Sequence, residues 1–161
     1  MVPVIAVRKG NPRHIRSVDD LASWGVRIAI CSPSTTLLGE FAGDIFRSSS
    51  LKKMIEKNIV TQMARPDGLL TMLILGSIDA GVIWHFYGSM AENEIDMVFF
   101  PPSQVRESGK MQIAVSAYCR NEEIAARYID FATSAEGREI FRKRGYFTGG
   151  EEEGKYVAGS D

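Results

Sequence analysis

The sequence predicts an α/β domain of three layers, with helices on both faces of a mixed or mainly parallel sheet. Strand-like and helical segments alternate along the chain, which is typical of this fold class. The strand-like stretch Val26–Ile30 is apolar at all but one position, as expected for a strand that is covered on both faces. The length of 161 residues fits one domain.

The first quarter of the chain predicts two strands joined by a short helix. Residues 2–7 are mostly β-branched and apolar, and the turn Gly10-Asn11-Pro12 ends them. Ser17 and Asp20 have the spacing of a capping box, which predicts a short helix after them. The strand Val26–Ile30 follows that helix.

Three helices are predicted after the second strand. Apolar residues recur at helical spacing over 38–46 and again over 51–59. Asp67 is suited to cap a third helix, which continues to Ile74 and ends at Gly76.

The rest of the chain predicts strands followed by two helices. Three segments are strand-like: 79–84, 96–100 and 111–118. Asn121 caps one helix, and Ser134 begins another that Gly145 terminates. Residues 148–161 are rich in Gly and Glu and predict a flexible polar tail, so the domain itself is expected to span 1–147.

The composition excludes several classes of function. Lys and Arg number 19 against 20 Asp and Glu, so the net charge of −1 argues against nucleic-acid binding. No apolar run approaches the roughly 20 residues of a membrane helix, and no signal peptide follows Met1. The two cysteines do not make a disulfide framework.

No signature of an enzyme, a metal centre or a cofactor site is present. The motifs G-x-S-x-G, H-E-x-x-H, C-x-x-C and G-x-G-x-x-G are all missing, and His14 and His85 lack metal-ligand spacing. Cys31 and His85 could approach each other as thiol and base, but no third group is available to orient them. We therefore expect no catalysis, metal or cofactor.

One group of residues is suited to binding an anion. Carboxyl ends of parallel strands meet at one edge of a sheet, where ligands bind. A hydroxyl-rich loop follows the strand Val26–Ile30 and opens a helix, whose free amides favour anions. The candidate ligand-binding residues are Ser32, Ser34, Thr35, Thr36, Trp84 and Tyr87. The alternative is that one hydroxyl only caps the helix and that the aromatic rings are core residues.

Several segments resemble one family in their order and spacing. The matching segments are Val4–Pro12, Ser17–Ala22, Gly25–Ile30, Ser32–Ala42, Asp79–Trp84, Ser134–Gly137, Ile140–Phe141 and Arg144–Tyr146. They resemble the molybdate/tungstate-type periplasmic solute-binding proteins of ABC transporters, over about Val2 to Phe147. The family often has Asp where this chain has Ser32, and Tyr where it has Trp84.

The resemblance implies a periplasmic-binding-protein-like lobe that captures a small oxyanion without chemistry. It implies an ABC transporter permease as partner and a periplasmic or extracellular-facing location. Family chains are longer, and their N-terminal lobe carries its own hydroxyl loop. This chain resembles the second lobe plus the C-terminal return, as a fragment, a shortened chain or a one-lobed relative.

Two further expectations follow from the resemblance. With the first lobe missing, we expect an exposed apolar face along the first strand and hence a homodimer. A one-lobed ligand-sensing module of a regulator is the alternative function, and an enzyme using Cys31 and His85 is the third.

Overall fold

A mixed sheet forms the centre of the molecule in the computed structural model, which describes residues 1–149 and 154–158. In sheet order β3-β2-β4-β1-β5, β2 pairs in parallel with β3 and β4, whereas β1 runs antiparallel to β4 and β5. The strands are β1 (Pro3–Arg8), β2 (Ile28–Cys31), β3 (Ile59–Met63), β4 (Ala80–Trp84) and β5 (Ile95–Phe99). The predicted α/β class is confirmed.

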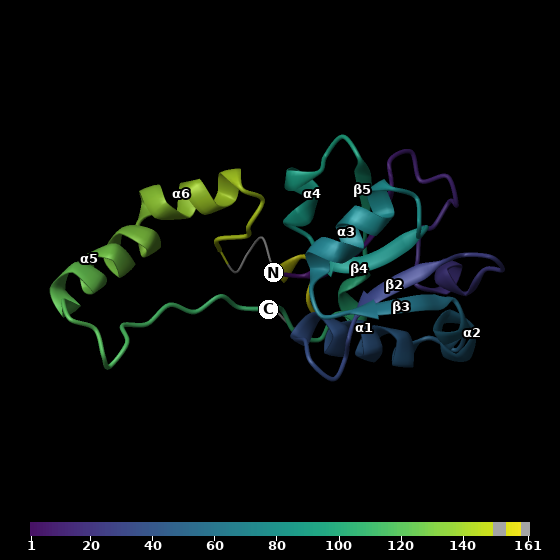
Figure 1. The fold of residues 1–161 in the computed structure, drawn as a ribbon, viewed down its shortest axis with the longest axis horizontal. Coiled ribbons are helices and arrows are strands. Elements are labelled where there is room, and N and C mark those ends of the chain that lie inside the picture. Colours follow the sequence, from purple (N-terminus) through teal and green to yellow (C-terminus); the bar gives the residue numbers. More distant parts are fainter. Residues whose placement is uncertain (150–153, 159–161) are drawn as a thin grey trace.

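Helices cover both faces of this sheet (Figure 1). Both α1 and α3 contact β2 and β4, and they lie on opposite sides of the strands in the figure. The helices are α1 (Leu37–Ser48), α2 (Lys52–Lys57), α3 (Pro66–Ile74), α4 (Tyr87–Met90), α5 (Glu122–Thr133) and α6 (Ala135–Lys143). Single 3-10 turns span Asp19–Ala22 and Pro102–Gln104.

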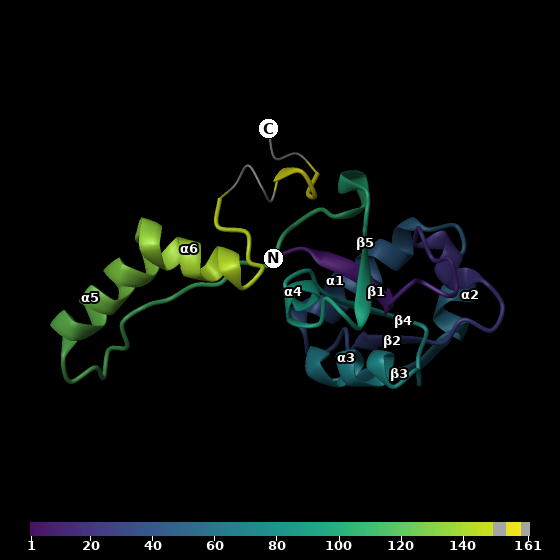
Figure 2. The same cartoon turned by 90° about the horizontal axis from the view of Figure 1, so that it is seen from above.

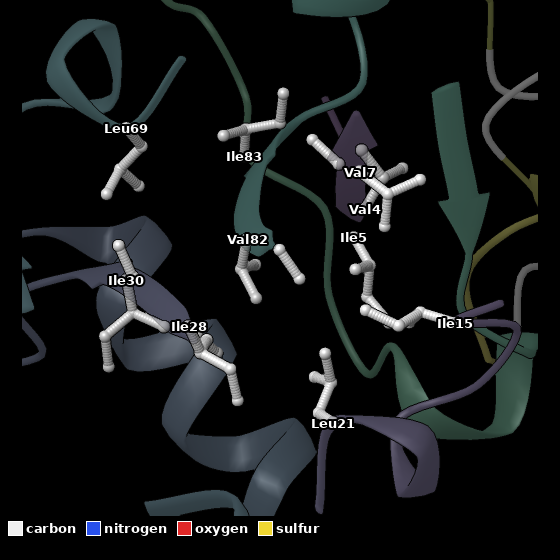
Figure 3. Packing of buried hydrophobic residues seen from close by; sticks show 14 of the residues in the cluster. Val4, Ile5, Val7, Ile15, Leu21, Ile28, Ile30, Leu69, Val82 and Ile83 are labelled. Atoms are coloured by element: carbon white, nitrogen blue, oxygen red, sulfur yellow. The ribbon is translucent and has the colours of Figure 1, made fainter. Parts of the chain in front are cut away.

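The hydrophobic core is built around the two central strands, β1 and β4. Ile5 and Ile83 are at most 1% exposed, and they pack with side chains from the neighbouring strands, loops and helices (Figure 3). Five of the six residues of β1 are buried, because β4 and β5 flank it in the sheet and α1 and α3 pack on it. The expectation of an exposed apolar face along the first strand was therefore wrong.

Two strand predictions also differ from the structure. Residues 59–63 form β3 at the edge of the sheet, where alternate positions are half-buried, although the pattern indicated that helix 51–59 ran into them. Residues 111–118 form no strand, because nothing lies beside them to complete a ladder in the described part of the chain. An isolated strand has no hydrogen-bond partner and is not stable.

The capping box before the first helix is only half formed. The Asp20 carboxylate accepts hydrogen bonds from the Ser17 amide at 2.9 Å and from its hydroxyl at 3.0 Å. The Ser17 hydroxyl thus donates to the acid instead of capping an amide, and the helix is limited to one 3-10 turn.

Residues 110–147 leave the body as an arm (Figures 1 and 2). An extended segment runs outward, and α5 and then α6 return to the body. Asn121 and Ser134 cap these helices as predicted, accepting from the amides of Ile124 and Gly137 at 3.0 and 3.1 Å. Neither helix buries a large side chain.

The predicted tail begins beside the body. Tyr156 stacks on Phe99 with ring centroids 4.5 Å apart, and the Ala158 amide donates to the Val105 carbonyl at 2.8 Å. Residues 150–153 and 159–161 lie outside the described residues, so the division at residue 147 stays a prediction. None of the helices in the described ranges is long and apolar enough to cross a membrane.

Candidate functional site

The carboxyl ends of three parallel strands meet at one edge of the sheet. These ends are Cys31 of β2, Met63 of β3 and Trp84 of β4. The Ser32 amide donates to the Met63 carbonyl at 2.8 Å, so the loop after β2 starts beside the end of β3. The topology thus places both predicted segments, 32–36 and 84–87, at the same edge.

The loop after β2 is a tight turn centred on the Ser32 carbonyl. This oxygen accepts from the amides of Thr35 and Thr36 at 3.2 and 3.1 Å, and from the Thr36 hydroxyl at 2.9 Å. The same Thr36 hydroxyl accepts from the Gly39 amide at 3.0 Å and so caps α1. The Thr36 hydroxyl therefore caps the helix, as in the alternative interpretation of the sequence.

Other donors of this loop are not engaged elsewhere in the described part of the chain. Ser34 and Thr35 are exposed, and the Ser32 and Ser34 hydroxyls lie 3.0 Å apart. Among the residues that the structure describes, the amides of Leu37 and Leu38 in the first turn of α1 have no hydrogen-bond partner. The positive end of the helix dipole adds to them, so a negative group is favoured here.

Gly39 allows α1 to approach the end of β2 closely. A Cβ at this position would lie 2.5 Å from the carbonyl oxygens of Cys31 and Ser32. Backbone atoms cannot yield as a flexible side chain can, so only glycine fits without a shift. The helix start, with its free amides, is held against the loop in this way.

A second polar cluster lies at the same edge. The Tyr87 hydroxyl donates to Asp67 Oδ1 at 2.8 Å, and Arg65 Nη2 contacts Asp67 Oδ2 at 2.6 Å. These hydrogen bonds, that of Tyr87 foremost, lower the pKa of Asp67. Burial and the Asp67 carboxylate raise the pKa of Tyr87. Asp67 thus stays charged, with Arg65 as its counter-ion.

The two aromatic residues that were expected to line the site lie in different surroundings. Trp84 packs edge-on against Phe41 at 5.9 Å, and a Cβ on Gly109 would lie 2.8 Å from its ring. Tyr87 stacks on Phe86 at 4.7 Å and belongs to the Asp67 cluster. The structure therefore places Trp84 near the point where the arm leaves the body.

The geometry gives no support to a Cys31–His85 catalytic pair. Cys31 is buried, and burial raises the pKa of its thiol, whereas a nucleophilic cysteine needs a lowered pKa. His85 Nδ1 accepts from the Val2 amide at 3.1 Å, and its ring stacks on Phe147 at 4.0 Å. Within residues 1–149 and 154–158, no three acidic, His or Cys side chains gather as a metal site.

Arg65 and Asp67 are the site residues that the sequence pattern did not single out. Asp67 was expected to cap α3, but it lies inside the first turn, and Arg65 precedes the helix. The signal was a charged pair, Arg65 and Asp67, two to four residues after the end of a strand, but the sequence pattern had not predicted β3.

Replacing Tyr87 by Phe removes the hydrogen bond that lowers the pKa of Asp67 most. We expect the pKa of Asp67 to rise towards its usual value in Tyr87→Phe, because the remaining Arg65 contact is exposed to solvent. A carbon-detected NMR titration of the carboxyl measures this. Tyr128→Phe, on the exposed face of α5, is the control, and an unchanged Asp67 titration in Tyr87→Phe would show that the hydrogen bond does not form.

The sheet with its hydroxyl-rich edge is that of a solute-binding lobe, and comparison with known proteins gives the same class. The model of the family of bacterial extracellular solute-binding proteins matches residues 1–147, and this chain belongs to that family.

Two curated relatives and one solved structure show the extent of the similarity. A Haemophilus influenzae protein described as a binding protein is 26% identical over 145 residues, covering 90% of this chain and 58% of its own. The molybdate-binding protein ModA of Mycobacterium tuberculosis is 27% identical over 143 residues, covering 89% and 52%. The sulfate-binding protein SubI of the same species shares the fold, with a TM-score of 0.72 at 17% identity, covering 89% and 55%.

The chain therefore spans about half the length of the curated relatives it matches. The matched residues include the arm as well as the body, since the family model extends to residue 147.

Proposed function

We propose that this chain supplies one wall of the ligand cleft of an ABC-transporter solute-binding protein, and that the ligand is a small oxyanion. The observation that carries the proposal is the loop 32–36 running into α1 at the edge where β2, β3 and β4 end together. The family membership supports capture of a solute, and the name of the ModA relative suggests an oxyanion such as molybdate.

The donors of this wall are of two kinds. Ser34 and Thr35 offer exposed hydroxyls, and the amides of Leu37 and Leu38 complete the set. Each hydrogen bond to a charged group contributes about 1.5–3 kcal/mol, so a few neutral donors hold a dianion without a counter-charge. Thr36 acts through the helix start and does not contact the ligand in this proposal.

The negative charge of Asp67 lies at the same edge as the proposed anion site. A bare carboxylate would repel an anion at this edge, but Arg65 lies against it at 2.6 Å and offsets its charge.

The family function adds an ABC transporter permease as partner, a location outside the cytoplasmic membrane, and a second lobe that closes over the ligand.

Thermal unfolding with oxyanions tests this function. Molybdate, tungstate, sulfate and phosphate are added separately, with chloride at equal ionic strength as reference. A ligand that binds only the folded chain adds about 2.7 kcal/mol at a hundredfold excess over its Kd, so at least one oxyanion should raise the Tm. No rise with any of the four would contradict an oxyanion site on this wall.

Substitutions in the loop test the assignment of donors. Ser34→Ala should weaken binding of the active oxyanion by about tenfold or more, because it removes one hydrogen bond to a charge. Thr36→Ala should instead lower the stability of the free chain by about 1 kcal/mol, through loss of the α1 cap. Ser77→Ala, exposed and located before the amino end of β4, away from the loop, is the control. Equal affinities for Ser34→Ala and the parent would remove Ser34 from the site.

A further inference from the structure

Two exposed apolar side chains lie at the end of the body where β2 and β4 begin. Trp24, in the loop before β2, is 97% exposed, and Leu75, directly after α3, is 75% exposed. Figures 1 and 2 show the loop before β2 and the end of α3 on the side of the body that faces away from the arm. Large apolar side chains left this far in water are candidates for an interaction surface.

Hydrogen bonds from Asn58 hold the loop that carries Trp24. The side-chain nitrogen Nδ2 of Asn58 donates to the carbonyls of Leu21 and Ser23, both at 2.8 Å. Gly25, with φ of +76°, turns the chain from this loop towards β2. Trp24 is therefore presented by a fixed turn, so that covering its ring costs less conformational entropy than it would on a flexible loop.

Arginine side chains gather around a single carboxylate at the same end of the sheet. Arg27 donates to both carboxylate oxygens of Asp79 at 3.1 Å and to the Gly76 carbonyl at 2.8 Å. Arg13 Nε lies 3.4 Å from Asp79 Oδ1, and its Nη2 donates to the Gly25 carbonyl at 3.2 Å. Two guanidinium groups thus share one negative charge.

Arg8 brings a third guanidinium to this cluster. Its Nη1 would lie 2.5 Å from a Cβ on Gly76, and its side chain makes no hydrogen bond or ion pair within the described part of the chain. Three guanidinium groups against one carboxylate leave two positive charges uncompensated. Because Gly25 and Gly76 directly follow Trp24 and Leu75, these charges lie beside the two apolar side chains.

The exposed acidic side chains at this end of the body belong to other elements. Glu92 and Glu94 precede β5, where Lys9 pairs with Asp96 at 2.9 Å. Asp19, in the first 3-10 turn, accepts a hydrogen bond at 2.6 Å from a serine that follows α1. The surface is therefore positive over the starts of β2 and β4, and it becomes negative towards β5.

We propose that this basic face docks on an anionic phospholipid surface. The basic face is formed by Arg8, Arg13, Trp24, Arg27 and Leu75. The planar guanidinium group matches phosphate oxygens in a bidentate manner, and indole rings are enriched at the level of lipid headgroups. A protein partner would have to supply a pocket for the ring of Trp24, whereas a lipid surface accepts a protruding ring without one.

Docking by the basic face leaves the proposed ligand site free. The basic face lies where β2 and β4 begin, whereas the loop 32–36 follows the opposite end of β2. A chain held on lipid in this way keeps its hydroxyl-rich edge turned away from the headgroups. The inference therefore does not depend on which ligand the cleft takes.

The fluorescence of Trp24 tests the contact directly. In a Trp84→Phe background, whose fold is checked by circular dichroism, Trp24 is the remaining tryptophan. Its emission should shift to the blue with vesicles of phosphatidylcholine and phosphatidylglycerol, and should not shift with pure phosphatidylcholine or with inorganic phosphate at the same phosphate concentration. An unchanged emission with the anionic vesicles would favour a protein partner, and an equal shift with inorganic phosphate would indicate a site for a small anion. Either result would overturn the proposal.

Vesicle co-sedimentation of substituted chains tests the residues of the basic face. Arg8→Gln should weaken binding to the anionic vesicles about fivefold, because each basic residue near such a surface contributes a similar share. Arg106→Gln, which makes the same change of charge at another exposed position, is its control. Trp24→Ser should weaken binding about tenfold or more, with Met90→Ser, 69% exposed on α4, as its control. Binding that is equal in Arg8→Gln and Arg106→Gln, or in Trp24→Ser and Met90→Ser, would show that the contact is not made by this face.

Discussion

Gly39→Ala should destabilise the chain by about 3 kcal/mol and lower the Tm by about 6–12 °C. The added Cβ would lie 2.5 Å from the carbonyl oxygens of Cys31 and Ser32, so α1 must move away from β2. Because α1 packs on β1, β2 and β4, this movement disturbs the centre of the core. Urea unfolding followed by circular dichroism measures the loss.

The same helix provides a matched control. Gly43 also lies in α1, but a Cβ there meets only Arg47 Nη1, at 3.4 Å, and this side chain can move. Gly43→Ala should therefore stabilise the chain by about 0.5–1 kcal/mol, since alanine orders more easily than glycine in a helix. Equal effects of the two substitutions would mean that helix propensity, and not the close approach, governs Gly39.

The elements with a strong local pattern were predicted from the sequence. The helix over 38–46 is α1, and Asn121 and Ser134 cap α5 and α6 as expected, because caps and helical periodicity act within a few residues. Gly76 and Gly145 have φ of +71° and +83°, so both adopt the left-handed conformation that ends a helix.

Elements that depend on distant partners were harder to predict. Residues 59–63 became a strand because β2 lies beside them, whereas 111–118 remained extended but unpaired. The burial of the first strand also follows from topology: β5 pairs with β1 on its outer side, and α1 and α3 pack on it. A local pattern does not contain this information.

The site was predicted in outline only. The parallel order of β2 and β4 brings the two predicted segments to one edge, as the strand pattern implied. The role of each hydroxyl depends on the turn geometry: the Thr36 hydroxyl is engaged by Ser32 and Gly39, and Ser34 is exposed. Arg65 reaches this edge only because β3 does.

Asp79→Ala should cost about 3 kcal/mol of stability. Asp79 accepts from the Arg27 amide at 2.9 Å and from its guanidinium at 3.1 Å, and its side chain is only 11% exposed. Arg27 itself is 43% exposed and keeps the Gly76 carbonyl as an acceptor, so the loss comes mainly from the hydrogen bonds that the buried carboxylate accepts, each worth about 1.5–3 kcal/mol when one group is charged. Asp44→Ala is the control: its surface pair with Arg47 should be worth less than about 1 kcal/mol by the same urea titration.

Asp79 should also make the stability of the chain depend on pH in the acidic range. Burial alone would raise its pKa, but the hydrogen bonds and charge of Arg27, together with the charge of Arg13, hold the pKa below its usual value. A carboxyl whose folded pKa is lowered contributes its full stability above the unfolded pKa of about 3.9, and loses that contribution as the pH falls towards the folded pKa. The free energy of unfolding of the parent should thus fall more steeply below about pH 4 than that of Asp79→Asn.

Part of the slope should survive in the variant, because Asp20 and Asp96 also have lowered pKa values. Parallel pH profiles for parent and variant would show that Asp79 titrates alike in the folded and unfolded chain, and that its contacts with Arg27 do not stabilise the charged form.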